Sequence, residues 1–184
     1  MLDYDKAYLL NEGKKSGTMH FKPKCHNCDA DALHCAEVTP ETAIVYQWHS
    51  GRYVRDQMLT TEAVICLFSD RVFQVLRENR FSGWRTFPVQ LFDKENKIIE
   101  GYHGLSVTGR CGSLDKPRRV PIPRGKRWWR GLYVKDDFWD GSDVFLPYGT
   151  TFVFVTQEVK DALEAIRPSN IAFIRLSEFE AFWP

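Results

Sequence analysis

The sequence lacks a long apolar run. Its longest uninterrupted stretch is AVICLF, Ala63–Phe68, whereas a helix that crosses a bilayer needs about 20 apolar residues. We therefore expect no membrane-spanning helix. The opening residues MLDYDKAYLL contain Asp3 and Asp5 and no basic stretch followed by an apolar one, so we also expect no secretory leader.

Net charge is also nearly absent. The chain has 25 basic and 24 acidic residues, a formal charge of +1, which argues against a protein that coats nucleic acid or a membrane surface through a uniform field. Its five cysteines are an odd number without a regular framework, which favours a reducing compartment. We expect a cytoplasmic protein. Because 43% of its 184 residues are hydrophobic, it can bury a full core.

Common catalytic signatures are missing as well. There is no Gly-x-x-x-x-Gly-Lys-Ser/Thr loop, Gly-x-Gly-x-x-Gly turn, His-Glu-x-x-His helix or Gly-x-Ser-x-Gly elbow. Cys111 lies between two glycines beside Arg110, so we expect an exposed thiol with a lowered pKa. A phosphatase loop, however, requires Arg where Pro117 stands. We therefore expect a binding protein and no enzyme, with a thiol enzyme built on Cys111 as a remote alternative.

A cysteine-rich stretch near the beginning resembles half of a zinc site. CHNCDADALHC holds Cys25, Cys28 and Cys35 with two histidines, and Zn²⁺ prefers thiolate and imidazole ligands. A second Cys-x-x-Cys pair is absent, because Cys66 and Cys111 stand alone and far away. Zinc is the candidate cofactor. The alternative is a reduced turn whose cysteines pack as small apolar groups.

Two stretches 87 positions apart have the same pattern. Each begins with an apolar β-prone run, Ile65–Phe68 or Phe152–Val155, followed by Ser69 or Thr156 as a helix N-cap. Apolar residues at helical spacing come next. Each helix is expected to end in a turn, Ser82-Gly83 or Ser169-Asn170, before a second strand. The sequence thus predicts two β-α-β units, and their shared pattern suggests the hypothesis that they are pseudo-repeats of one another.

Further strands are expected at 43–48, 101–107, 131–134 and 143–147. Strands then outnumber helices, which indicates an α+β protein with a mixed or antiparallel sheet and two packed helices. Pro88 has no amide hydrogen and suggests an edge strand or a short one. Residues 1–40 show the least periodicity and are expected to form an irregular lobe, with the α+β core at 41–184.

The stretch LDKPRRVPIPRGKRWWRG, residues 114–131, combines seven cations with one acid, three prolines and two tryptophans. Planar rings among cations are typical of protein hot spots and of single-stranded nucleic-acid grooves. The alternative to a binding site is a solvated linker whose tryptophans fold back on the core. We expect an acidic protein partner here rather than nucleic acid. The candidate binding residues are Arg118, Arg119, Arg124, Lys126, Arg127, Trp128, Trp129 and Arg130.

Several phrases of the chain resemble a known family. SGWRTFPVQLFD (82–93), GYHGLSVTGRCGSLD (101–115) and WDGSDVFLPYGTTFVFVTQEVKDALE (139–164) are similar to immunity proteins of bacterial polymorphic-toxin systems. The group is related to myxobacterial proteins with double Cys-x-x-Cys-Gly motifs. The resemblance runs from about Thr61 to the C-terminus. Cys28 is followed by Asp29 and then only by the lone Cys35, so the N-terminal stretch departs from the double motif.

This resemblance implies a small cytosolic protein that binds and neutralises a cognate toxin by stoichiometric occlusion, without turnover. It carries over no binding residues, because immunity proteins diverge where they touch their toxins. The alternative is a nucleic-acid-binding protein that uses the loop 116–131 with the cysteine cluster as a zinc knuckle. The two hypotheses differ in salt dependence, since binding to phosphates weakens steeply as salt rises.

Overall fold

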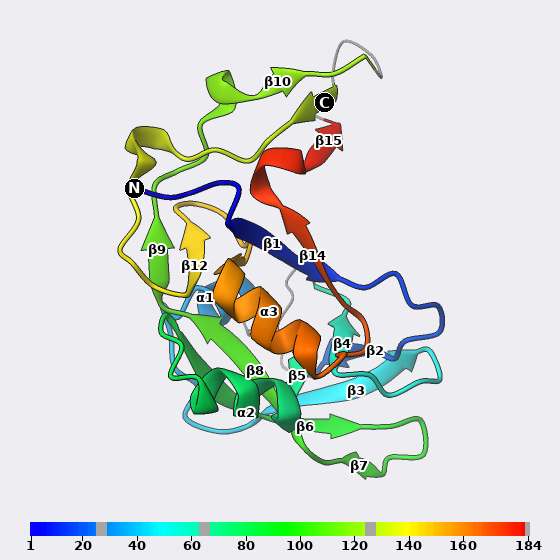
Figure 1. Ribbon diagram of the computed structural model, residues 1–184. Helices are drawn as coiled ribbons and strands as arrows, with labels where there is room; N and C mark the ends of the chain where they lie inside the picture. The colour runs from blue at the N-terminus through cyan, green and yellow to red at the C-terminus, as the bar shows by residue number, and fades with distance from the viewer. Residues whose placement is uncertain (25–28, 63–66, 124–127, 183–184) are drawn as a thin grey trace.

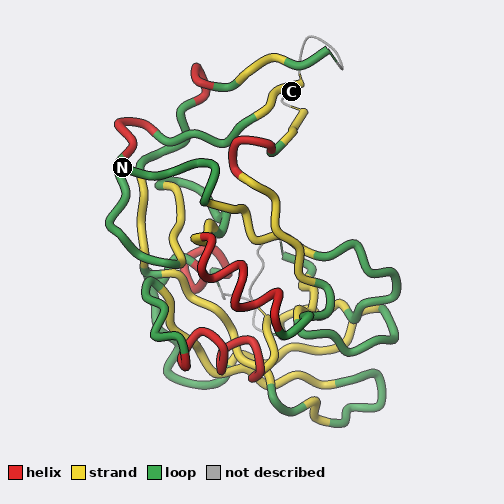
Figure 2. Tube along the Cα trace, in the orientation of Figure 1, coloured by secondary structure: helices red, strands yellow, loops and turns green. Residues whose placement is uncertain are grey.

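The computed structural model describes residues 1–24, 29–62, 67–123 and 128–182. Within these ranges the chain is mostly β, with three α-helices and three sheets (Figures 1 and 2). One sheet closes into a six-stranded mixed barrel, and the other two have five and three strands. The expected α+β class therefore fits broadly, although the strands form several sheets rather than one.

The barrel has the order β3-β2-β4-β5-β8-β6 and closes through pairing of β3 with β6. Its pairings β2–β4 and β3–β6 are parallel and the others antiparallel. Apolar side chains such as Phe21, Tyr46 and Phe87 fill the interior. The strands are β2 (His20–Pro23), β3 (Ile44–Ser50), β4 (Gln57–Thr60), β5 (Leu67–Ser69), β6 (Trp84–Phe92) and β8 (Tyr102–Val107), with β7 (Ile98–Ile99) added beside β6.

The five-stranded sheet is buried on both faces. Along β1, Tyr8 and Leu10 enter a core shared with the helices, whereas Ala7 and Leu9 enter a second core on the opposite face. Alternate residues point to opposite faces of a strand, so these strands read as continuous apolar runs. The order is β14 (Ile171–Arg175), β1 (Ala7–Glu12), β13 (Phe154–Thr156), β12 (Val144–Pro147) and β9 (Gly109–Cys111).

Two of the helices, α2 (Asp70–Glu78) and α3 (Gln157–Ala165), pack against each other in front of the two larger sheets (Figure 2). Val72 and Leu76 of α2 meet Val159 and Leu163 of α3 in one core cluster, as the helical spacing predicts. The short helix α1 (Ala30–His34) was not expected from the sequence and packs against β8. None of the helices in the described ranges has the length and apolarity needed to cross a membrane.

The two expected strand–helix–strand units are β5-α2-β6 and β13-α3-β14, and their described elements begin 87 residues apart. In each unit a third strand lies between the two outer ones, β8 in the first and β1 in the second. The registers also correspond: Leu67 pairs with Gly104 as Phe154 pairs with Leu9. The similarity of pattern thus extends to strand pairing.

Three sequence expectations need correction. Residues 1–40 are not an irregular lobe where described, because they supply β1, β2 and α1 and place Phe21 and Leu33 in the barrel core. Residues 131–134 form no strand, because their pairing is limited to an isolated bridge between Val134 and Leu114, and the Leu132 amide donates to the carbonyl of Leu176 at a 3₁₀ turn. Pro88 lies within the nine-residue β6, where pairing with β8 ends and pairing with β3 begins at Val89.

The third sheet, β10-β11-β15, stands apart from the body at the top of Figure 1. It consists of β10 (Val120–Pro121), β11 (Trp128–Arg130) and β15 (Glu180–Phe182), all antiparallel. The 3₁₀ turns η1 (Lys116–Arg118) and η3 (Leu176–Glu178) lead into it. We call residues 116–123, 128–130 and 179–182 the arm.

Candidate functional site

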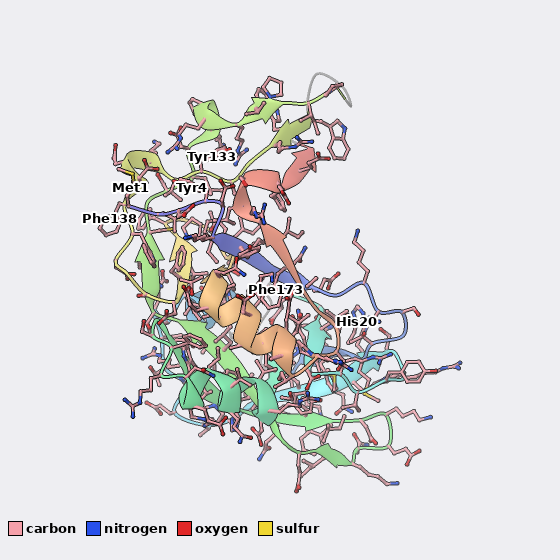
Figure 3. All side chains as sticks on the ribbon, in the orientation of Figure 1. Met1, Tyr4, His20, Tyr133, Phe138 and Phe173 are labelled. Carbon is pink, nitrogen blue, oxygen red and sulfur yellow. The ribbon has the colours of Figure 1, made fainter. Side chains whose placement is uncertain are left out.

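The arm carries the described part of the basic segment. Its base is held by the Arg118 guanidinium, which lies over the rings of Tyr4 and Tyr133 at 5.1 and 4.9 Å from their centroids. Figure 3 shows these two labelled tyrosines close together below the arm. Arg118 also donates to Asp137 Oδ1 at 2.5 Å. The guanidinium therefore joins the arm to both the N-terminal segment and the turn at Asp137.

The electrostatics of this contact are consistent with a structural role. The Tyr4 hydroxyl donates to Asp137 Oδ1 at 2.6 Å, and this bond together with the Arg118 guanidinium holds the pKa of Asp137 below its ordinary value. Burial, reinforced by the same hydrogen bond, raises the pKa of Tyr4 to about 12. Each group thus keeps the ionisation state that the contact needs at neutral pH.

The other described cations of the basic segment also interact within the chain. Arg130 on β11 pairs with Glu180 directly opposite on β15, with Nη2 at 2.7 Å from Oε1. Arg119 is buried, and desolvation lowers the pKa of its guanidinium. Arg124, Lys126 and Arg127 lie outside the described residues. The structure therefore does not present Arg118 and Arg130 as freely available cations.

The tryptophans take different sides of β11, because successive side chains of a strand alternate. Both are half-buried. Trp129 and Arg119 are brought together in a small apolar cavity of about 190 Å³ between the arm and the body. Its other lining residues are Gly131, Leu132, Phe152, Phe179 and Ala181. Such a cavity can accept one large side chain of a partner, as hot-spot anchors do.

The cysteine cluster is only partly described, because Cys25 and Cys28 lie outside the described residues. Cys35 follows α1, and its half-buried thiol points to Thr150 O at 3.9 Å. His34 is buried with Nε2 3.2 Å from Thr151 O, and burial lowers the pKa of its imidazole. Among the described residues, no group of three or more His, Cys, Asp and Glu side chains could hold a metal. Zinc binding by Cys25, Cys28 and Cys35 stays a prediction.

The expectation for Cys111 is wrong. Its side chain is 2% exposed and packs in the core beside Leu132 and Phe145. Burial raises the pKa of the thiol to about 12, and the Arg110 guanidinium turns to the carbonyl oxygens of Val107, Gly109 and Cys35. The flanking glycines indicate exposure, but Cys111 lies on the edge strand β9, where it pairs in parallel with Pro147 of β12 and turns its side chain into the core.

Serine, aspartate and histidine do meet at the start of α2, although not as a nucleophilic triad. Ser69 Oγ donates to Asp56 Oδ1 at 2.8 Å, whereas His103 Nε2 contacts a different acid, Asp70, at 3.0 Å. A nucleophilic serine needs a base within hydrogen-bond reach of its hydroxyl. These residues form two separate pairs, so this corner offers no activated nucleophile.

A larger cavity of about 390 Å³, which the sequence did not indicate, lies between β1 and β4. Its walls include Leu9, Gln57, Glu62 and Phe152, which come from separate parts of the chain. No local motif marks such a site. Gln57 is fully buried on the strand β4, and its burial is visible only in the structure.

Comparisons with known proteins yielded no relative: no protein-family model matches this chain, and neither does any curated protein.

Proposed function

We propose that this chain is a cytoplasmic immunity protein that binds a cognate bacterial toxin through the arm and neutralises it by stoichiometric occlusion. The proposal rests on the apolar cavity beside Trp129, at the base of a sheet that projects from the body. The resemblance of residues from about Thr61 onward to immunity proteins supports it independently. The chain works as a binding partner and not as an enzyme.

The chemistry of the arm favours an acidic protein as the partner. Residues 114–131 contain seven basic residues against the single acid Asp115. Next to this charge, Val120 is an exposed apolar side chain on the outer strand β10. An apolar anchor site within a charged rim is typical of tight protein interfaces. Nucleic acid is the less suitable partner, because the whole chain has a formal charge of only +1 and one basic segment makes a small electrostatic footprint on a phosphate backbone.

The proposal expects a toxin gene immediately upstream of the gene for this chain, and the absence of one would count against it. The toxin found there would be produced as a catalytically inactive variant for calorimetry and as the active form for growth rescue. The wild-type protein is expected to bind it in a one-to-one complex and to restore growth. Absence of binding and of rescue would refute the immunity function.

Two matched substitutions test the arm. Val120→Glu adds an acid at a 53% exposed position of the arm and is expected to weaken toxin binding at least tenfold. Ile98→Glu makes the same change at a 57% exposed position on β7, at the opposite end of the molecule, and should leave affinity unchanged. Equal affinity of both variants would show that another surface binds the toxin.

Tight, strongly salt-dependent binding of a single-stranded oligonucleotide would favour the alternative function, which is nucleic-acid binding.

A further inference from the structure

The cavity of about 390 Å³ between β1 and β4 is separate from the arm's small cavity, although Phe152 and Phe179 contribute to both. Leu9, Met58, Leu59, Phe152 and Phe179 make most of its walls apolar. His20, labelled in Figure 3, lines it from β2. A volume of this size matches the pockets that proteins use for small molecules.

Gln57, which lines this cavity, is fully buried, and neither Nε2 nor Oε1 of its amide has a hydrogen-bond partner. Glu62 also lines the cavity, and its Oε2 atom is likewise buried without a hydrogen-bond partner. Among the described residues, these two side chains supply three of the eight buried polar atoms that lack a partner. Unpaired buried polar atoms are therefore concentrated at this cavity.

Such atoms are costly. A buried amide without a partner destabilises a fold, and native proteins retain such groups mainly where a ligand or water satisfies them or where function requires them. The other amide of this kind, Gln47, still donates through Nε2 to Asp93 O at 3.0 Å. The Gln57 side-chain amide makes no hydrogen bond through either Nε2 or Oε1. Its backbone is paired, because the Gln57 amide donates to Ser169 O and the Gln57 carbonyl accepts from Asn170 Nδ2.

We propose that this cavity binds a small molecule that carries a carboxamide-type edge, one donor beside one acceptor, on an apolar body. A primary amide such as Gln57 offers a donor and an acceptor together, so a second amide edge can satisfy both at once. The leucine, methionine and phenylalanine walls bury the apolar body. The Glu62 carboxyl supplies a further polar contact.

Benzamide is the probe, because it joins an apolar ring to a carboxamide edge; benzoate has nearly the same shape without the donor. We expect saturation-transfer NMR and thermal shift to detect benzamide and not benzoate. In the wild-type protein, the Gln57 side-chain amide resonances should move during the benzamide titration. No binding of benzamide, equal binding of benzoate, or unmoved Gln57 resonances would each overturn the proposal; the first result would indicate that water alone satisfies the amide.

Gln57→Met removes the amide at nearly constant volume. It is expected to raise the melting temperature of the free protein, because an unpaired buried amide is replaced by an apolar side chain, and to weaken benzamide binding at least tenfold. Gln47→Met, the matched change on β3, should lower the melting temperature and leave benzamide binding intact. A lower melting temperature for Gln57→Met, or unchanged benzamide binding, would overturn the proposal.

Discussion

Asp56 connects the barrel to the five-stranded sheet through its buried carboxylate. Oδ1 accepts from Ser69 Oγ at the end of β5, and Oδ2 accepts from both the amide and the hydroxyl of Ser169, next to β14. Burial opposes ionisation of Asp56. The hydrogen bonds from Ser169 and Ser69, with the Arg71 guanidinium, outweigh burial and hold the pKa of Asp56 below its ordinary value.

Asp56→Asn is expected to destabilise the protein by about 2 kcal/mol at pH 7, because a charged acceptor of three hydrogen bonds is lost. Since the folded pKa is lowered, this stabilisation is fully present above the ordinary carboxyl pKa of about 4 and disappears as pH falls through the folded value. Urea unfolding from pH 7 to pH 3 measures both effects.

The matched control is Glu95→Gln, since the Glu95 carboxylate pairs with Lys97 at 2.8 Å but is 55% exposed. Glu95→Gln should change the free energy of unfolding by no more than about 0.5 kcal/mol. A difference between Asp56→Asn and wild type that grows as the pH falls below 4 would contradict the lowered pKa.

Cys111 supplies a second prediction at this scale. With its pKa raised to about 12, the thiolate fraction at pH 8 is roughly three orders of magnitude below that of a free cysteine. Iodoacetamide should therefore leave Cys111 unmodified in the native protein and modify it in 8 M urea, as peptide mass spectrometry would show. Rapid native modification would restore the hypothesis of a reactive thiol.

At the scale of the element, the sequence located the outer strands and the helices of both units, because helical spacing and turn residues are local signals. It placed Ser69 and Thr156 correctly at the helix N-caps, yet neither side chain caps its helix. The Ser69 hydroxyl donates to Asp56 instead, and the Thr156 hydroxyl is buried without a partner. Tertiary contacts override local capping preferences in both cases.

The strand expected at 101–107 is confirmed as β8, but its place between β5 and β6 does not follow from the same signals, and neither does the strand β1. β8 and β1 occupy equivalent places, but one follows its unit and the other precedes it by more than 140 residues. Strand pairing over that separation leaves no local trace in the sequence, which is why residues 7–12 do not stand out there as a strand. A barrel closed by β3–β6 pairing is nonlocal for the same reason.

The turns after the helices offer a test of the unit. Gly83 and Asn170 are 87 positions apart, and both have positive φ angles, +86° and +65°. At Gly83 a Cβ atom would lie 2.0 Å from Val144 O. Gly83→Ala should therefore cost about 3 kcal/mol, from the φ angle and the clash together. Thermal and urea unfolding would measure this loss.

Gly141→Ala is the control, because its φ of +87° is similar and no atom lies within 4 Å of the added Cβ. It should cost only about 1 kcal/mol. Equal losses for the two variants would mean that the close approach of Val144 to the turn is unimportant.

The candidate site was predictable only in part. The run of cations and tryptophans indicated the arm, since composition is local. The sequence could not reveal that Asp137 and Glu180 pair with Arg118 and Arg130, or that Arg119 is buried. No pattern in the sequence indicated the larger cavity, because its walls come from five separate parts of the chain.

At the scale of the whole molecule, α2 and α3 unite the two larger sheets in one core. Side chains of β1, β5, β8, β12 and β13 all enter the cluster that contains these helices. A shared core couples the stability of its contributors. Barrel and five-stranded sheet should therefore unfold together, with coincident transitions by tryptophan fluorescence and far-ultraviolet circular dichroism.

Leu163→Ala tests this coupling. The buried Leu163 of α3 shares the cluster with Phe73 and Leu76 of α2, and the truncation should cost about 3 kcal/mol. Hydrogen exchange is expected to lose protection equally in α2 and α3. Glu164→Ala changes an exposed neighbouring position and should alter neither the free energy of unfolding nor the hydrogen-exchange protection of the helices. Lost protection confined to α3 would show that the units unfold separately.

The position of β1 has a consequence for synthesis on the ribosome. Its pairing partners begin at Phe154 and Ile171, so the strand emerges long before either of them. At about 5–20 residues per second, the delay is on the order of 10 s. During that time Tyr8, Leu9 and Leu10, which are buried in the finished fold, have no sheet to join. Nascent chains stalled before residue 154 should therefore expose β1 to chaperones and to aggregation.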